Sequence, residues 1–162
     1  MIFIGIGSNL PSPAGPPRAT AEAAAAALTR AGLRVRRRSR WYESPPVPPS
    51  DQPWYVNGVV EIETDLEPAA LLAVLHRIEA EFGRTRTVPN AARPLDLDLI
   101  AYDDRVLDGA DGVIVPHSRM HERAFVLLPL AELAPDWRHP RTGEAISALI
   151  AALPAGVQAR AI

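Results

Sequence analysis

Two acidic residues stand two positions apart in the segment "RPLDLDLIAYD", residues 93–103. Leucines alternate with Asp96 and Asp98, and this period of two is typical of a strand with one face in the core. The two carboxylates should share a face, roughly 6.5 to 7 Å apart. Carboxylate oxygens are hard ligands of the kind that Mg²⁺ takes, together with phosphates and waters. The pair is a candidate metal site, although an acidic pair alone is more often the solvated face of a strand.

Basic residues flank the acidic pair along the chain. Arg84, Arg86 and Arg93 precede it, and His117 and Arg123 follow it. A metal held by acids beside several arginines is what phosphate-group transfer requires, because the metal clamps the phosphates and the guanidinium groups neutralise charge as it develops. Each arginine alone is also compatible with ordinary surface, but the set favours phosphate chemistry.

Other motifs for phosphate binding or nucleophilic catalysis are absent from the sequence. It has no G-x-x-x-x-G-K-[ST] motif, and "GIGSNL" has Leu10 where a dinucleotide-binding fingerprint needs a third glycine. We therefore expect Gly7 and Asn9 to form a turn. His117 and His121 are four residues apart but lie outside any H-E-x-x-H motif, which disfavours a zinc site.

Length and composition limit the class of protein. A chain of 162 residues is most simply one domain, residues 1–162. It has no cysteine, so disulfides and thiolate metal sites are excluded and a reducing compartment is compatible. A net charge of −2 argues against binding to long nucleic acid. No segment approaches the roughly twenty apolar residues of a membrane span, so we expect a cytoplasmic protein.

Hydrophobic patterning predicts the elements that position these residues. The expected strands are "MIFIGIG", "LRVRRRSRWYE", "WYVNGVVEIET" and "LDLDLIAYD", and the expected helices begin at Pro17 and Pro68 and end at Gly32 and Gly83. Two more helices are expected, one broken or kinked at Pro129 and one in "EAISALIAAL". The first four strands and two helices follow the order β-α-β-β-α-β. This order predicts an α+β, ferredoxin-like fold with helices packed on one face of a mainly antiparallel sheet, and extra C-terminal elements.

Four arginines recur at period two in the second expected strand. They are Arg34, Arg36, Arg38 and Arg40. The spacing predicts one charged face, which is either a solvated face that discourages edge pairing or an anion site.

The proline-rich segment "SPPVPPSDQPWYVNG", residues 44–58, is predicted to be a stiff loop that leads into a strand. With Trp54, Tyr55 and Asn57 it could form one wall of a pocket for a flat polar heterocycle, where an amide reads donors and acceptors and an aromatic ring stacks. The alternative is a loop that only covers a sheet edge.

Five segments resemble, in order, those of the 6-hydroxymethyl-7,8-dihydropterin pyrophosphokinases of the folate pathway. They are "GSNL", "YESPPVPPSDQPWYVNGVV", "RIEAEFGRTR", "RPLDLDLIAYD" and "VPHSRMHERAFVLLPLAELAP". The resemblance spans nearly the whole chain. It implies a diphosphotransferase that moves pyrophosphate from ATP to the hydroxymethyl group of the dihydropterin and releases AMP, with two Mg²⁺ ions bound beside ATP.

The resemblance also implies roles for single residues. Asp96 and Asp98 would hold the metals, and Arg84 and Arg93 would be catalytic by gripping the phosphates and stabilising the transition state. The residues implied for ATP binding are His76, Glu79, Arg84, Arg86, Arg93, His117, Ser118 and Arg123. Those implied for pterin binding are Ser44, Pro45, Pro46, Val47, Tyr55, Asn57 and Phe125. The expected partners are these two small molecules, without nucleic acid or membrane, and the expected state is a monomer.

Two alternatives use the same fold without catalysis. The βαββαβ order also serves RNA-recognition modules, but the sequence lacks their K/R-G-F/Y-G/A-F-V-x-F/Y strand. A pterin-binding protein is the other alternative, suggested by Gly112 and Ile114, which stand where the family resemblance leads one to expect an arginine and a threonine that contact the nucleotide.

Overall fold

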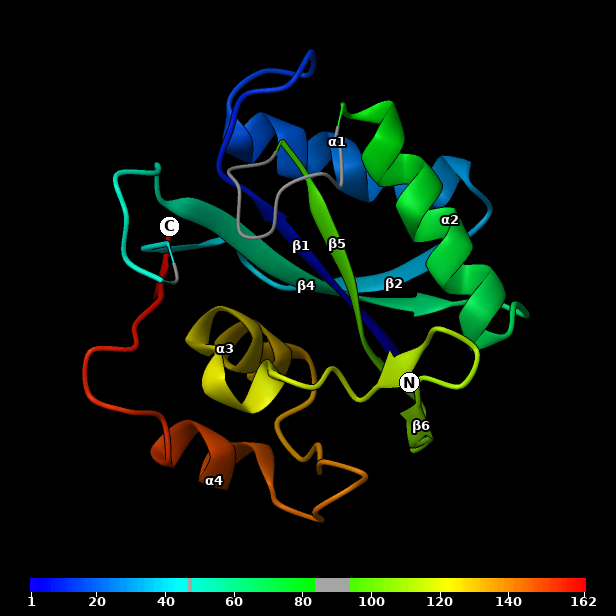
Figure 1. Ribbon diagram of the computed structural model, residues 1–162, viewed down its shortest axis with the longest axis vertical. Coiled ribbons are helices and arrows are strands. Elements are labelled where there is room, and N and C mark those ends of the chain that lie inside the picture. Colours follow the sequence, from blue (N-terminus) through cyan, green and yellow to red (C-terminus); the bar gives the residue numbers. More distant parts are fainter. Residues whose placement is uncertain (47, 84–93) are drawn as a thin grey trace.

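The computed structural model describes residues 1–46, 48–83 and 94–162 (Figure 1). The first elements are β1 (Ile2–Ser8), α1 (Pro17–Arg30), β2 (Arg34–Arg38), β3 (Tyr42–Ser44), β4 (Tyr55–Glu63), α2 (Pro68–Glu81) and β5 (Asp96–Tyr102). They are followed by β6 (Leu107–Asp108), β7 (Ile114–Val115), a 3-10 turn (Met120–Glu122), α3 (Ala124–Leu133), α4 (Ile146–Ala151) and β8 (Arg160–Ala161). The predicted β-α-β-β-α-β order is confirmed, with the second predicted strand divided into β2 and β3.

The main sheet has the strand order β5-β1-β4-β3-β8, and β2 also pairs with β4. Every pairing between these strands is antiparallel. The predicted α+β fold with an antiparallel sheet is therefore confirmed. Because β1 lies between β4 and β5, residues of these three strands meet at each end of the sheet.

The prediction that four arginines share one face of a single strand is wrong. The register between β2 and β4 shifts between Val35 and Arg37, so two consecutive arginines both reach acids of β4. Arg36 pairs with Glu63 at 2.5 Å and Arg37 with Glu61 at 2.7 Å. A β-bulge of this kind inserts an extra residue and re-aims side chains. These ion pairs favour the charged-surface interpretation of the segment over an anion site.

Helices cover both faces of the sheet, whereas the sequence predicted helices on one face (Figure 1). One core lies beneath α1 and α2 and includes four alanines of α1, Leu75 of α2 and Trp41. The second core lies beneath α3 and α4 and includes Phe3, Val59 and Trp137. The segment after β5 therefore completes the protein as a three-layer arrangement.

The two predicted helices each begin with a proline and are followed by a glycine. Pro17 and Pro68 are the first residues of α1 and α2. Gly32 and Gly83 follow these helices with φ of 90° and 88°, a conformation that glycine adopts without strain. Helix α3 continues through Pro129 without a break. Among the residues described, no helix combines the length and the apolar character needed to cross a bilayer.

Candidate functional site

The candidate site lies where β1 ends and β4 and β5 begin. Gly7 of β1 is paired with Asn57 of β4 on one side and with Asp96 of β5 on the other. Directly paired residues of antiparallel strands point to the same face of a sheet. Asn57 and Asp96 therefore rise from the same face, on either side of Gly7. It is the face that α3 covers, because Val59, two residues beyond Asn57, belongs to the core beneath α3.

The two acids of β5 stand as the alternation predicted. Leu97 and Leu99 are buried in the core beneath α1 and α2, whereas Asp96 and Asp98 are half-buried on the opposite face. The Oδ2 atom of Asp98 lies 3.9 Å from Nη1 of Arg123. The Asp98 side chain is 29% exposed and that of Arg123 is 25% exposed. A contact of this length is a loose ion pair, which a cation or an anionic ligand can rearrange.

Glu79 of α2 meets the main chain between the two acids. Its carboxylate is buried, and Oε2 accepts a hydrogen bond of 2.8 Å from the N–H of Leu97. Glu79 thus fixes the outer edge of β5 just where the strand carries Asp96 and Asp98. His76, one turn earlier on α2, is exposed.

His117 follows β7 and lies near both an acid and a base. Its main-chain N–H donates to the carbonyl of Ile100 at 2.8 Å. Burial, as the main cause, and the nearby positive charge of Arg123 together lower the pKa of His117 to about 4, against the opposing effect of Asp96. The imidazole is therefore neutral at pH 7. Because its Nδ1 accepts a hydrogen bond from the N–H of Arg119, its Nε2 carries the proton and is a donor.

Three of the residues expected to bind the heterocycle, Asn57, Ser44 and Tyr55, lie on the other side of Gly7. Nδ2 of Asn57 donates a hydrogen bond of 3.1 Å to Oγ of Ser44, and both side chains are buried. Ser44 of β3 is paired with Tyr55 of β4, which is half-buried. Pro45 is half-buried and Pro46 is buried at the start of the proline-rich loop.

Arg123 connects the acidic and the aromatic parts of the site. Its guanidinium carbon lies 5.4 Å from the centre of the Phe125 ring, a cation–π distance, while Nη1 faces Asp98. Phe125 lies in the first turn of α3, half-buried against the core beneath that helix. Ser118 is exposed beside His117.

The sequence did not reveal the role of Asn9. The expected turn at Gly7 and Asn9 is wrong for Gly7, which lies inside β1. Asn9 is fully buried just after the strand, and its Nδ2 donates to Oε1 of Gln52 at 3.1 Å and to the carbonyl of Pro53 at 3.3 Å. It anchors the proline-rich loop to the end of β1. An amide directly after a buried strand was the available signal.

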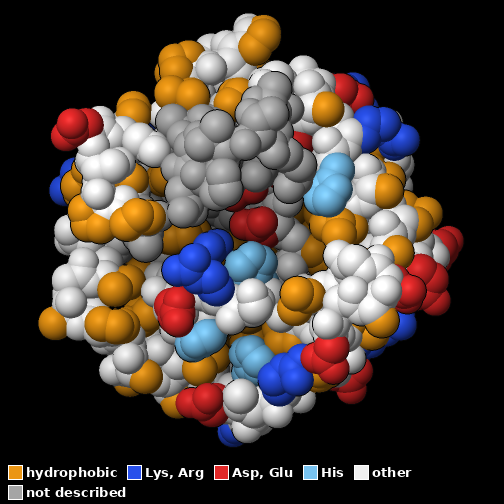
Figure 2. Space-filling view, in the orientation of Figure 1, with side chains coloured by type: hydrophobic (Ala, Val, Ile, Leu, Met, Phe, Trp, Pro, Cys, Tyr) orange, Lys and Arg blue, Asp and Glu red, His pale blue; other side chains and the backbone are white. Residues whose placement is uncertain are grey.

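Acidic, basic and histidine side chains adjoin one another on the face of α3 (Figure 2). Four predicted site residues lie outside the described residues: Val47, Arg84, Arg86 and Arg93. All the others are described. Eight of them lie on or are linked to the three neighbouring strands: Ser44, Tyr55, Asn57, Glu79, Asp96, Asp98, His117 and Arg123.

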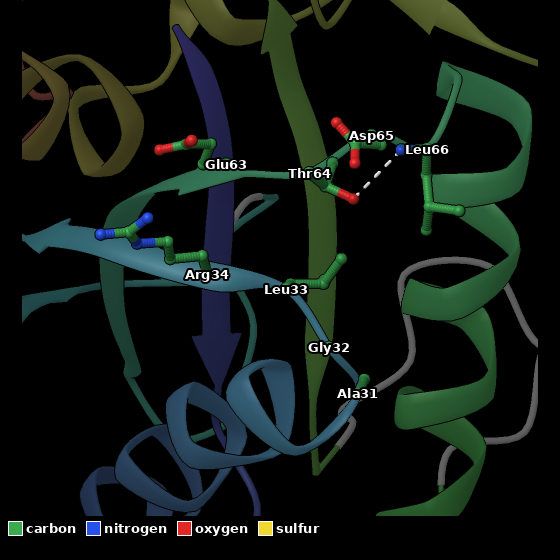
Figure 3. A pocket seen from close by; sticks show the side chains of 8 residues that line it. All are labelled: Ala31, Gly32, Leu33, Arg34, Glu63, Thr64, Asp65 and Leu66. Carbon is green, nitrogen blue, oxygen red and sulfur yellow. Dashed lines mark hydrogen bonds between the residues drawn. The ribbon is translucent and has the colours of Figure 1, made fainter.

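A separate hollow of about 400 Å³ lies at the opposite end of β4 (Figure 3). It is lined by Ala31, Gly32, Leu33, Arg34, Glu63, Thr64, Asp65 and Leu66. None of these is among the residues predicted to bind metal, ATP or the pterin, so this hollow is distinct from the candidate site.

Residues 3–135 match the family model of 7,8-dihydro-6-hydroxymethylpterin-pyrophosphokinase. The chain belongs to this pyrophosphokinase family. A Synechocystis 2-amino-4-hydroxy-6-hydroxymethyldihydropteridine pyrophosphokinase is 45% identical over 91% of this chain and 73% of its own length. One from Pseudomonas aeruginosa is 42% identical over 94% and 91%. The predicted family and enzyme class are thereby confirmed.

Solved structures with the same fold are pyrophosphokinases joined to a further domain. HPPK-DHPS in complex with substrates superposes with a TM-score of 0.69 at 14% identity over 91% of this chain. Wild-type Plasmodium falciparum HPPK-DHPS gives 0.68 at 14% identity over the same share. The chain spans 42% and 43% of those longer chains. At this identity the likeness confirms the ferredoxin-like fold.

The acidic pair of this pyrophosphokinase suits a cation that arrives with phosphates. No group of three or more histidine, cysteine, aspartate or glutamate side chains in the described ranges could hold a metal by itself. Mg²⁺ is commonly bound through one or two carboxylates while substrate phosphates and waters complete an octahedron. Asp96 and Asp98 provide such a pair on one face, so the residues present fit a nucleotide-bound metal.

Proposed function

We propose that the chain transfers pyrophosphate from ATP to the hydroxymethyl group of 6-hydroxymethyl-7,8-dihydropterin, with AMP as the other product. The register at Gly7 is the observation that carries this proposal, because it places the amide of Asn57 and the carboxylate of Asp96 on one face of adjacent strands. Neighbouring strands are about 4.8 Å apart, so these two residues stand about 10 Å apart across β1. A heterocycle on Asn57 can thus present its hydroxymethyl group toward phosphates held near Asp96.

The reaction needs position and charge neutralisation more than a reactive side chain. The substrate hydroxyl oxygen attacks the β-phosphorus of ATP, the bond from that phosphorus to the oxygen of AMP breaks with its electron pair, and the hydroxyl proton is released. No covalent bond to the enzyme is required. Holding both substrates in line and surrounding the transferred group with donors supplies most of the acceleration.

The phosphate end is assigned to residues on both sides of the acids. Neutral His117 would donate its Nε2 proton in a hydrogen bond to a phosphate oxygen. Arg123 would exchange its loose contact with Asp98 for a phosphate. Arg84 and Arg93 stay predicted catalytic residues that also bind ATP, Arg86 stays a predicted ATP-binding residue, and so do His76 and Ser118. Glu79 would serve ATP binding by holding β5 in place.

Two Mg²⁺ ions are proposed to bind with ATP through Asp96 and Asp98. When bound, they would neutralise charge on the phosphates and hold the transferred group in line. The chain's own contribution is to hold the two carboxylates at a fixed spacing. That spacing is supported by the buried leucines on the opposite face and by Glu79 at the strand edge.

The pterin end is proposed to use residues from β3, β4 and α3. Asn57 would read the polar edge of the heterocycle, and the Phe125 ring would stack on its face. The remaining residues proposed to line this end are Ser44, Pro45, Pro46, Val47 and Tyr55. The enzyme is proposed to act as a cytoplasmic monomer, and gel filtration tests the monomeric state.

The test is to incubate the protein with ATP, Mg²⁺ and the dihydropterin alcohol and to measure AMP. We expect AMP in proportion to enzyme, and a loss of about a hundredfold or more in kcat for Asp96→Asn and for Asp98→Asn. Asp104→Asn is the matched control, because Asp104 is an exposed acid just beyond β5. Absence of AMP, or full activity of the double variant Asp96→Asn/Asp98→Asn, would refute the assignment. Pterin binding without AMP would support the non-catalytic alternative.

A further inference from the structure

On the face of the sheet that bears the site, the side chains of the central strand β1 change from phenylalanine to glycine. Phe3 is fully buried in the core beneath α3. Gly5 and Gly7 follow at period two on the same face, with Asp98 and Asp96 as their partners in β5. The strand therefore supports α3 at one end and offers only main chain where it crosses the site.

Position 7 requires glycine because there is no space for a side chain there. The φ of Gly7 is not among the positive values found for other glycines, so an ordinary residue could adopt its backbone conformation. A Cβ at this position would lie 2.6 Å from Oδ1 of Asn57. The next nearest atoms are Cγ of Asn57 at 3.7 Å and Cδ1 of Tyr55 at 3.9 Å. The amide of Asn57 therefore occupies the space that a side chain at Gly7 would fill.

The amide group of Asn57 is also held at its nitrogen atom. Its Nδ2 donates to Oγ of Ser44 at 3.1 Å, and Asn57 and Ser44 are 5% and 2% exposed. The amide plane is therefore fixed between Ser44 and the bare main chain of Gly7. A methyl group at Gly7 would push Oδ1 away, and because the amide is planar, Nδ2 would move with it.

We propose that Gly7 is a specificity-determining positioning residue, whose missing side chain sets the orientation in which Asn57 reads the substrate heterocycle. This inference rests on the proposed function, because it takes the heterocycle to be the pterin. Gly5 plays no such part. A Cβ there would lie 3.2 Å from Cδ1 of Ile100 and 3.8 Å from Cβ of Asp98, on the side away from Asn57.

The decisive measurement is a double-mutant cycle between Gly7→Ala and Asn57→Ala. Dissociation constants for the dihydropterin alcohol and for a non-hydrolysable ATP analogue with Mg²⁺ are measured by calorimetry, and KM and kcat by AMP formation. We expect Gly7→Ala to raise the pterin dissociation constant by about tenfold, the size of one lost hydrogen bond, with the analogue changed by less than about threefold. In the Asn57→Ala background, Gly7→Ala should add less than about twofold, because no amide remains to be displaced.

Gly5→Ala is the matched control, because it adds the same methyl group to the same strand and face. It should leave the pterin dissociation constant within about threefold of the parent. The inference is overturned if Gly7→Ala weakens pterin and ATP analogue equally, or if its effect on pterin binding is unchanged when Asn57 is alanine. Should Gly7→Ala fail to fold, a folded Gly7→Ala/Asn57→Ala variant supports the inference and an unfolded one overturns it.

A spectroscopic arm is independent of the reaction. The side-chain amide signals of Asn57 in a ¹H–¹⁵N spectrum of the substrate-free protein should shift in Gly7→Ala and stay in place in Gly5→Ala. Unmoved signals in Gly7→Ala would overturn the inference. If the parent forms no AMP while these signals still shift, the proposed function fails and the contact between Gly7 and Asn57 stands.

Discussion

The carboxylate of Glu79 accepts a hydrogen bond of 2.8 Å from the main-chain N–H of Leu97, the residue between Asp96 and Asp98. Strand β5 is at the edge of the sheet, where main-chain donors lack a neighbouring strand. Helix α2 therefore supplies the partner that a further strand would otherwise provide. The acids that are proposed to bind metal are held from both sides, by β1 and by α2.

Replacing Glu79 tests this support. Glu79→Gln keeps an acceptor oxygen, whereas Glu79→Ala leaves the N–H of Leu97 buried and unpaired, which costs roughly 1 to 3 kcal/mol. We expect the alanine variant to lower the free energy of unfolding by that amount, and to need more Mg²⁺ for half-maximal AMP formation. Glu79→Gln should lie close to the parent. Equal loss of activity in both variants, with unchanged stability, would instead indicate a direct contact with the nucleotide.

Arg123 is expected to affect ATP far more than folding. Its contact with Asp98 is 3.9 Å long and partly exposed, so removing it should change the free energy of unfolding by less than about 1 kcal/mol. We expect Arg123→Ala to raise the KM for ATP by about tenfold or more, since a phosphate loses a charged donor. Arg123→Lys should recover only part of this loss, because lysine keeps the positive charge but lacks the planar guanidinium group that donates two parallel hydrogen bonds. A lowered melting temperature with an unchanged KM would contradict the prediction.

Asn9 is expected to hold the proline-rich loop in place for the pterin. Asn9→Ala removes both hydrogen bonds to the loop, whereas Gln52→Ala removes one acceptor and leaves the carbonyl of Pro53. We expect Asn9→Ala to raise the pterin KM several-fold and to speed proteolytic cleavage within residues 48–53, with a smaller effect for Gln52→Ala. Equal cleavage rates in the parent and Asn9→Ala would show that the loop does not depend on this anchor.

The low pKa of His117 predicts a pH-dependent stability. Its folded pKa is about 4 and its usual value is 6.5, so between these pH values the unfolded chain binds more protons than the folded chain. The free energy of unfolding should therefore fall as pH drops from 6.5 to 4, by at most about 3 kcal/mol from this group. Above about pH 7.5 both states have lost this proton, so the group contributes almost no slope.

Denaturant titrations in the absence of ATP and metal measure this slope. His117→Asn should flatten the dependence between pH 6.5 and 4. His121→Asn is the control, since His121 is exposed on the 3-10 turn, and it should retain the parent's dependence. Parallel curves for the parent and His117→Asn would show that other groups cause the acid sensitivity.

The alternation of Leu97 and Leu99 with Asp96 and Asp98 was sufficient to place the acids on a shared face, because strand period is a local property of the chain. The starts of α1 and α2 were also predictable, since proline favours a first helical turn. Contacts between segments that are far apart in the sequence were not predictable. The bulge after Val35 depends on pairing with β4, which no local pattern encodes.

The roles of Gly7, Asn9 and Glu79 were missed for the same reason. Glycine in an apolar run is compatible with a turn as well as with a strand, and only the register with Asn57 explains why position 7 is bare. A glutamate within a helix is ordinarily exposed, and only the position of β5 makes Glu79 a buried acceptor. Family resemblance, not spacing, was needed to name the substrates.

The distribution of tryptophan gives this enzyme a built-in set of optical reporters. Trp41 is buried in the core beneath α1 and α2, Trp137 is buried in the core beneath α3 and α4, and Trp54 is 44% exposed in the proline-rich loop. These are the three tryptophans of the chain. Single-tryptophan versions, made by replacing the other two with phenylalanine, would therefore report by emission on each layer, or on the loop that is proposed to line the pterin, without any attached dye.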